Sequence, residues 1–224
     1  HPNGGFLGNI LISVLHNVQR YPKNLYFYKM KTAVYLGSRK GLSPEFCENA
    51  RELGRLLANN GVEVVYGGSR VGTMGALFDG VVEAGGKVTG VFPRNFTGRK
   101  EYAKLGVKIF EDGAGYEKYT VIQTDTLAER IRTMETLADV CILLPGSYGS
   151  MHEFFSFFEG NELGTFRKPL AILNLNGYYN PLLDLLRNME AAGFSDKGDL
   201  ASLIVAETPA ELVKKILHCV QNDS

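Results

Sequence analysis

Apolar positions follow two different spacings along most of this chain. Short apolar runs such as Val62–Tyr66 are typical of buried strands, and longer segments with apolar residues three and four apart predict amphipathic helices. The predicted strands are Thr32–Leu36, Val62–Tyr66, Lys87–Phe92, Tyr119–Gln123, Asp139–Leu144, Pro169–Leu173 and Leu203–Ala206. The predicted helices are Pro44–Asn60, Val71–Ala84, Thr126–Ala138, a segment entered at Ser150, Pro181–Ala192 and Pro209–Val220.

Strands that alternate with helices require crossover connections, and these produce parallel sheets covered on both faces. The sequence therefore predicts an α/β fold, a Rossmann-like doubly wound parallel sheet with helices on both faces. We expect residues 30–224 to form a single domain and residues 1–29 to be a leader whose structure the pattern leaves open. The glycine-dotted stretch between Arg94 and Tyr119 predicts a loop-rich excursion, in which Val107–Phe110 would suit a short strand.

Three glycine turns follow predicted strands, at Gly37, Gly67 and Gly146. In doubly wound sheets, ligands bind beyond the carboxyl ends of the strands, so we expect these turns to line one pocket. The third turn leads into a helix that carries Ser150 and then Glu153, which we place in its first turn. Exposed N–H groups and the helix dipole favour an anion there, and phosphate is the obvious ligand.

The composition narrows the classes of function. Lys plus Arg and Asp plus Glu number 24 each, so no global basic field favours nucleic acid. No apolar run approaches the roughly 20 residues that span a membrane. Cys47, Cys141 and Cys219 fit neither a disulfide framework nor a zinc spacing, so we expect a cytoplasmic protein. The G-x-G-x-x-G and G-x-x-x-x-G-K-[ST] patterns are absent, which disfavours NAD, FAD and P-loop chemistry.

Four segments, in the right order, resemble one family. Pro145–Glu153 reads PGSYGSMHE and resembles the P-G-G-x-G-T-x-x-E signature of the Lonely Guy family. Tyr66–Ala76, which reads YGGSRVGTMGA, resembles that family's Y-G-G-G-x-x-G-L-M-G-A. Ala33–Ser38 looks like its first strand and turn, and Glu129–Arg130 falls where the family has E-R-K. Members are cytokinin riboside 5′-monophosphate phosphoribohydrolases, and many relatives carry the older label of lysine decarboxylase.

The resemblance implies a nucleotide-binding domain that cleaves a nucleoside 5′-monophosphate to free base and ribose 5-phosphate. It implies Arg130 and Glu153 as the catalytic pair, a homodimer, and no metal or organic cofactor. The substrate-binding residues that we expect are Gly37, Ser38, Gly67, Gly68, Ser69, Gly72, Gly146, Ser147, Gly149 and Ser150. Four positions differ from the family pattern: Ser69 and Ser147 replace glycines, Ser150 replaces a threonine and Ile131 replaces a lysine.

Alternatives stay open at this point. The same fold could serve a non-catalytic carrier of a nucleotide or phosphate-bearing cofactor. Arg130 could be an exposed helix residue paired with Glu129 or Glu135. His152 suits a surface or interface position better than acid–base catalysis, and the aromatic residues after Glu153 suit core and dimer packing. A literal lysine decarboxylase would need a Schiff-base lysine for pyridoxal phosphate, and no motif here supplies one.

Overall fold

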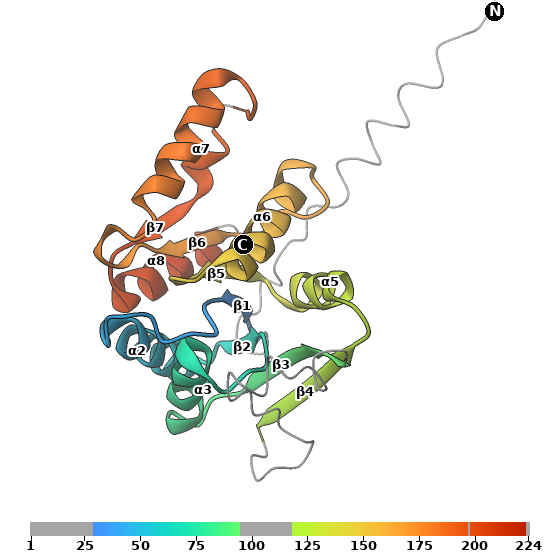
Figure 1. Cartoon of the computed structure of the whole chain (residues 1–224), viewed down its shortest axis with the longest axis vertical. Coiled ribbons are helices and arrows are strands. Elements are labelled where there is room, and N and C mark those ends of the chain that lie inside the picture. The colour runs from blue at the N-terminus through green and yellow to red at the C-terminus, as the bar shows by residue number, and fades with distance from the viewer. Residues whose placement is uncertain (1–28, 95–117, 197, 223–224) are drawn as a thin grey trace, which may run out of the picture.

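Seven parallel strands form one sheet in the computed structural model, which describes residues 29–94, 118–196 and 198–222 (Figure 1). The order across the sheet is β4-β3-β2-β1-β5-β6-β7. The strands are β1 (Lys31–Tyr35), β2 (Glu63–Tyr66), β3 (Val88–Pro93), β4 (Tyr119–Thr124), β5 (Val140–Leu143), β6 (Leu170–Leu173) and β7 (Ile204–Ala206). The predicted leader and the run Val107–Phe110 lie outside the described residues.

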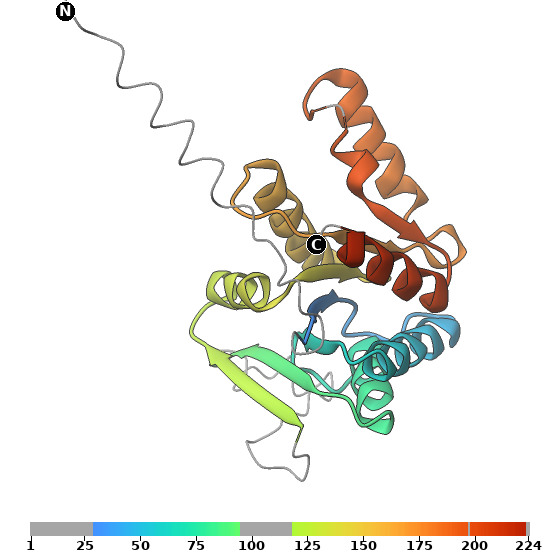
Figure 2. The ribbon, with the colours of Figure 1, turned by 180° about the vertical axis from the view of Figure 1, so that it is seen from behind.

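Helices cover both faces of the sheet and connect the successive strands, except that the link from β3 to β4 lies outside the described residues (Figures 1 and 2). One face packs against α2 (Glu45–Asn59), α3 (Gly72–Glu83) and α8 (Pro209–Asn222). The other face packs against α5 (Leu127–Leu137), α6 (Tyr148–Glu162) and α7 (Asn180–Ala192). Two short 3₁₀ helices, η2 (Leu175–Gly177) and η3 (Leu200–Ser202), flank α7.

Alternation along each strand sends neighbouring side chains to opposite cores. In β1, Val34 joins the core beneath α2, α3 and α8, whereas Ala33 and Tyr35 join the core beneath α5, α6 and α7. All four residues of β5 are buried, because a parallel strand in the middle of the sheet is covered on both sides. The continuous apolar runs of the sequence therefore mark central strands, and the predicted fold class is confirmed.

The strand order reverses beside β1, and this reversal creates the place for a site. The chain winds from β1 through β2 and β3 to β4, and then returns to place β5 on the other side of β1. Tyr35 at the end of β1 is in register with Leu143 at the end of β5. A crevice is expected at such a switch point, beyond the carboxyl ends of the strands. In the described part of the chain, no helix is long and apolar enough to cross a membrane.

Candidate active site

A cavity of about 280 Å³ lies at the carboxyl ends of β1, β2, β3 and β5. Nine of the predicted site residues line it: Gly37, Ser38, Gly67, Ser69, Arg130, Ser147, Gly149, Ser150 and Glu153. The remaining wall is apolar and was missed by motif reasoning: Leu36, Met74, Phe92, Pro93 and Leu127. Met74 lies inside the motif Tyr66–Ala76, and Phe92 and Pro93 lie at the end of a predicted strand. Their positions along the chain could therefore have identified them as residues of the site.

Arg130 and Glu153 form a buried ion pair in this cavity. The side chains of Arg130 and Glu153 are only 10% and 7% exposed. The Nη1 group of Arg130 donates to Oε1 of Glu153, and its Nε donates to the backbone oxygen of Val91 over 2.9 Å. Burying two charges costs desolvation free energy that their attraction barely offsets, so such a pair is weak evidence for a stabilising role. A chemical role in the cavity explains the burial of this pair better than a stabilising role does.

Glu129 and Glu135 have other partners, so neither pairs with Arg130. The backbone N–H of Glu129 donates to Oγ1 of Thr126 over 3.1 Å, and its carboxylate accepts from the backbone N–H of Asp125 over 2.8 Å. Both bonds cap the start of α5. Glu135 accepts from Oγ of Ser156 over 2.7 Å. Arg130 is therefore the buried member of this motif, and the reading of it as an exposed helix arginine is wrong.

The start of α6 differs from the sequence prediction. The helix begins at Tyr148, with Ser147 as its N-cap, so Ser150 lies inside the first turn. At 3.6 residues per turn, Glu153 falls in the second turn and not in the first. Its carboxylate consequently points sideways at Arg130 and does not cap free N–H groups. Ser147 has φ of −126° and ψ of −153°, an extended conformation that serine adopts as readily as glycine.

Two tyrosines hold the turn before α6 in place. The hydroxyl of Tyr178 donates to the backbone oxygen of Gly146, and that of Tyr179 donates to the oxygen of Leu144, each over 2.6 Å. Gly146 is not part of the cavity wall. A Cβ at this position would come within 2.2 Å of Oγ of Ser150, so the site requires glycine. The predicted turn is thus present, but its first glycine provides packing space and the residues after it face the cavity.

The turn after β2 is shaped by close backbone contacts. A Cβ at Gly67 would lie 2.4 Å from Nη2 of Arg130, so only glycine leaves room for the guanidinium. Gly68 has φ of +76°, a conformation that favours glycine. Gly68 and Gly72 do not line the cavity, and Gly72 instead lines a neighbouring groove with Arg39. We expected both glycines to bind substrate, but neither of them is part of the cavity wall.

Burial affects two further groups near the pair. Burial raises the pKa of Tyr35 well above its ordinary value, with smaller effects from Cys141 and Glu153. Burial likewise raises the pKa of the Cys141 thiol.

Ile131, where the family has a lysine, is buried on the inner side of α5. In the described residues, no group of three or more His, Cys, Asp and Glu side chains is arranged to hold a metal ion.

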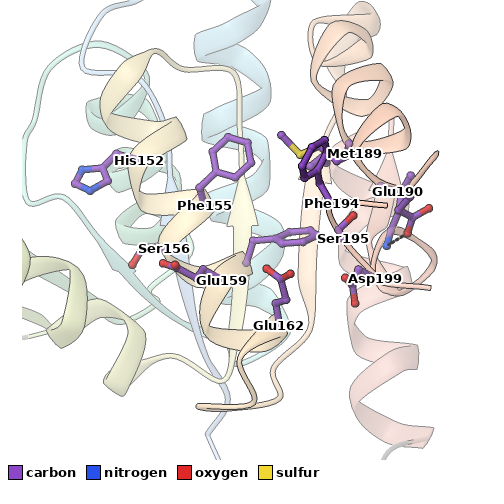
Figure 3. Close-up of a pocket in the computed structure, with 13 residues that line it drawn as sticks. His152, Phe155, Ser156, Glu159, Glu162, Met189, Glu190, Phe194, Ser195 and Asp199 are labelled. Atoms are coloured by element: carbon purple, nitrogen blue, oxygen red, sulfur yellow. Dashed lines mark hydrogen bonds between the residues drawn. The ribbon is translucent and has the colours of Figure 1, made fainter. Parts of the chain in front are cut away.

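A second, larger cavity lies away from the predicted residues. It has a volume of about 440 Å³ and runs between α6, α7 and the segment after α7. Figure 3 shows Phe155 of α6 facing Met189 and Phe194, with His152 directed to the outer side. His152 is exposed, as expected for a surface residue. Phe154 and Phe157 are fully buried in the core, as expected for core packing, whereas Phe155 and Phe158 are half-buried and line this cavity.

Comparisons with known proteins agree with the motifs. The family model described as "Possible lysine decarboxylase" matches residues 74–216. A probable cytokinin riboside 5′-monophosphate phosphoribohydrolase of Oryza sativa subsp. japonica is 35% identical over 83% of this chain and 78% of its own length. A cytokinin riboside 5′-monophosphate phosphoribohydrolase of Rhodococcoides fascians is 33% identical over 78% of this chain and 82% of its own length.

Solved structures share the fold at greater sequence distance. The molybdenum cofactor binding protein of Rippkaea orientalis superposes with a TM-score of 0.61 at 22% identity, covering 87% of this chain and 99% of that one. Such a distant likeness shows the fold alone. The relatives of higher identity, the matching family model and the four motifs around the Arg130–Glu153 pair agree with one another. The chain belongs to the Lonely Guy family of lysine-decarboxylase-like proteins.

Proposed function

We propose that this protein hydrolyses the N-glycosidic bond of a nucleoside 5′-monophosphate, either a cytokinin riboside monophosphate or AMP. The products are the free base and ribose 5-phosphate. The observation that carries the proposal is the buried Arg130–Glu153 pair, which lines a cavity next to the N-terminus of a long helix. Relatives named for this reaction, at about one third identity over most of the chain, support the same substrate class.

The phosphate would bind at the start of α6. Ser147, Gly149 and Ser150 line the cavity there, where the first backbone N–H groups of a helix lack partners within the helix. Those N–H groups and the positive end of the helix dipole favour a dianionic phosphate. Anchoring the phosphate at one end of the substrate positions the sugar, and that positioning energy can be expressed at the reacting carbon.

Glu153 and Arg130 would divide the chemistry between them. As the bond to the base breaks, positive charge develops on the ribose ring, and the Glu153 carboxylate would stabilise that charge. The same carboxylate would orient the attacking water and take its proton. Arg130 donates to Glu153, so it would hold that carboxylate in place and donate to negative charge that develops elsewhere on the substrate.

We further propose that the protein works as a cytoplasmic homodimer without a cofactor. Family resemblance supports the dimer, and exposed apolar side chains such as Tyr148, which is 93% exposed, lie beside the cavity. Cys47 and Cys141 carry free thiols, which suits a reducing compartment. Equal numbers of basic and acidic residues favour neither nucleic acid nor an anionic membrane surface as a partner. Light scattering on the purified protein measures the subunit number directly.

The test is release of free base and ribose 5-phosphate from AMP and from isopentenyladenosine monophosphate. The wild type should cleave at least one of them, and Glu153→Ala should abolish cleavage while the variant still folds. Both nucleotides should be followed by chromatography, together with binding by calorimetry. Tight binding without cleavage by the wild type would overturn the proposal in favour of a non-catalytic carrier on this fold.

A further inference from the structure

Ser69 carries a buried hydroxyl without a hydrogen-bond partner in the described structure. The residue is 5% exposed, lines the candidate cavity, and its Oγ has no bonded neighbour. Polar groups buried in proteins are nearly always paired, so an unpaired one needs an explanation. Its backbone is fixed, because Gly68 before it has φ of +76° and its Cα lies close to Gly90. This backbone conformation holds the serine at the cavity wall.

The two ends of the cavity differ in polarity. Ser147, Gly149 and Ser150 come from the turn between β5 and α6 and form the polar end. The opposite wall comes from the ends of β2 and β3 and the starts of α3 and α5. That wall consists mainly of apolar side chains, which are Met74, Phe92, Pro93 and Leu127. Among the described residues there, Ser69 adds a hydroxyl to the apolar surface.

We propose, resting on the proposed function, that Ser69 determines base specificity by donating a hydrogen bond to a ring nitrogen of the base. With phosphate at the start of α6 and the sugar beside Glu153, the strand order places the base over the ends of β2 and β3. Apolar side chains there suit the flat faces of a base. Rotation about the Cα–Cβ bond of Ser69 brings Oγ from its buried position to the cavity.

This assignment concerns how the site recognises the base of the proposed nucleotide substrate. A donor that is unpaired in the free protein and paired in the complex improves binding of a base with the matching acceptor. A base that lacks the acceptor leaves the hydroxyl unpaired and is rejected. The family pattern that Tyr66–Ala76 resembles has glycine at the position of Ser69, so this discrimination would set the chain apart from that pattern.

The test compares AMP with its 1-deaza, 3-deaza and 7-deaza analogues, each of which replaces one ring nitrogen with C–H. For the wild type, kcat/KM should fall about 5- to 30-fold for the analogue that lacks the contacted nitrogen. Ser69→Ala should lose a similar factor on AMP and lose nothing further on that analogue, as expected for two coupled partners. The melting temperature of Ser69→Ala should equal or exceed that of the wild type, because an unpaired buried hydroxyl has been removed.

Ser156→Ala is the matched control, because Oγ of Ser156 is paired with Glu135 over 2.7 Å and lies in the other cavity. It should lower the melting temperature and leave discrimination among the four nucleotides unchanged. An equal loss on all four nucleotides in Ser69→Ala would overturn the specificity role. If the wild type cleaves none of them, the proposed hydrolase fails, and calorimetric Kd values for the same four ligands then test Ser69. A flat set of Kd values in wild type and variant would overturn the inference as well.

Discussion

Helix α6 places carboxylates in two cavities, and their surroundings differ completely. Glu153 on its inner side is 5% exposed and paired with Arg130. Glu159 and Glu162, which line the second cavity between α6 and α7, are exposed to solvent. This second cavity is larger than the first, yet Glu190 in its wall binds the local backbone, because it accepts from the N–H groups of Gly198 and Leu200. A fixed charge in a desolvated wall can stabilise a transition state, whereas a solvated one is largely screened.

The largest expected effect comes from exchanging one carboxylate for an amide in each cavity. Glu153→Gln keeps the size of the side chain and a hydrogen bond to Arg130 but removes the negative charge. We expect kcat for base release to fall at least about 100-fold, because the developing positive charge on the ribose loses its counter-charge. Glu159→Gln in the second cavity should change kcat less than about 2-fold. Steady-state kinetics on the better nucleotide substrate measures both.

Circular dichroism and melting curves must accompany these kinetics. Removing one member of a buried ion pair leaves a buried charge, which costs about 3–5 kcal/mol when the partner is deleted outright. The amide keeps the hydrogen bond but leaves the buried Arg130 without its counter-charge, so Glu153→Gln should melt below the wild type and above Glu153→Ala. Loss of activity from Glu159→Gln equal to that from Glu153→Gln would contradict the distinction between the two cavities.

The next largest effect is expected for Arg130→Lys. Lysine keeps the positive charge but lacks the planar group that donates to Val91 and Glu153 at the same time. Glu153 would lose its fixed orientation, and we expect kcat/KM to fall about 10- to 100-fold. Arg187→Lys is the control, since Arg187 is 61% exposed and pairs with Asp184 on the surface of α7. If both variants keep wild-type rates, charge alone suffices and the geometry of the pair is irrelevant.

Two glycines of the site differ in how much space surrounds them. A Cβ at Gly67 would lie 2.4 Å from Nη2 of Arg130, whereas a Cβ at Gly149 meets no atom within 4 Å. Gly67→Ala should therefore lower the free energy of unfolding by about 1–3 kcal/mol through overpacking. Gly149→Ala lies in the first turn of α6 and should be neutral or stabilising by up to about 1 kcal/mol. Urea unfolding of the two variants checks the contrast, and equal destabilisation would contradict it.

The sequence predicted the elements well because central parallel strands are continuous apolar runs and their helices are amphipathic. The family resemblance, not the apolar pattern, assigned Arg130 and Glu153 to one site. These residues follow β4 and β5, which β3, β2 and β1 separate in the sheet. What it missed depends on exact helix starts and packing. Ser150 resembles an N-cap locally, but the extended backbone of Ser147 starts α6 earlier and moves Glu153 to the second turn. The burial of Ser69 without a partner follows from contacts across β2 and β3, which no local pattern encodes.

The smallest expected effect concerns Tyr35, a buried group near Glu153 whose hydroxyl has no partner. Because burial raises its pKa above the ordinary value of 10.0, the folded protein keeps a proton that the unfolded chain releases. Its stabilising contribution is complete below pH 10 and declines as the pH rises toward the folded pKa. Above pH 10, the free energy of unfolding should therefore fall by up to about 1.4 kcal/mol per pH unit for this group.

Tyr35→Phe removes that titrating hydroxyl and should reduce the alkaline slope of the unfolding free energy by about this amount. At neutral pH the variant should be as stable as the wild type or slightly more stable, since no hydrogen bond is lost. Tyr148→Phe is the matched change at a ring that is 93% exposed, and it should leave the slope unchanged. Urea titrations at several pH values above 9 measure the slopes. Equal slopes in Tyr35→Phe and wild type would mean that Tyr35 ionises without unfolding, and that the wall behind Glu153 is wetter than its burial indicates.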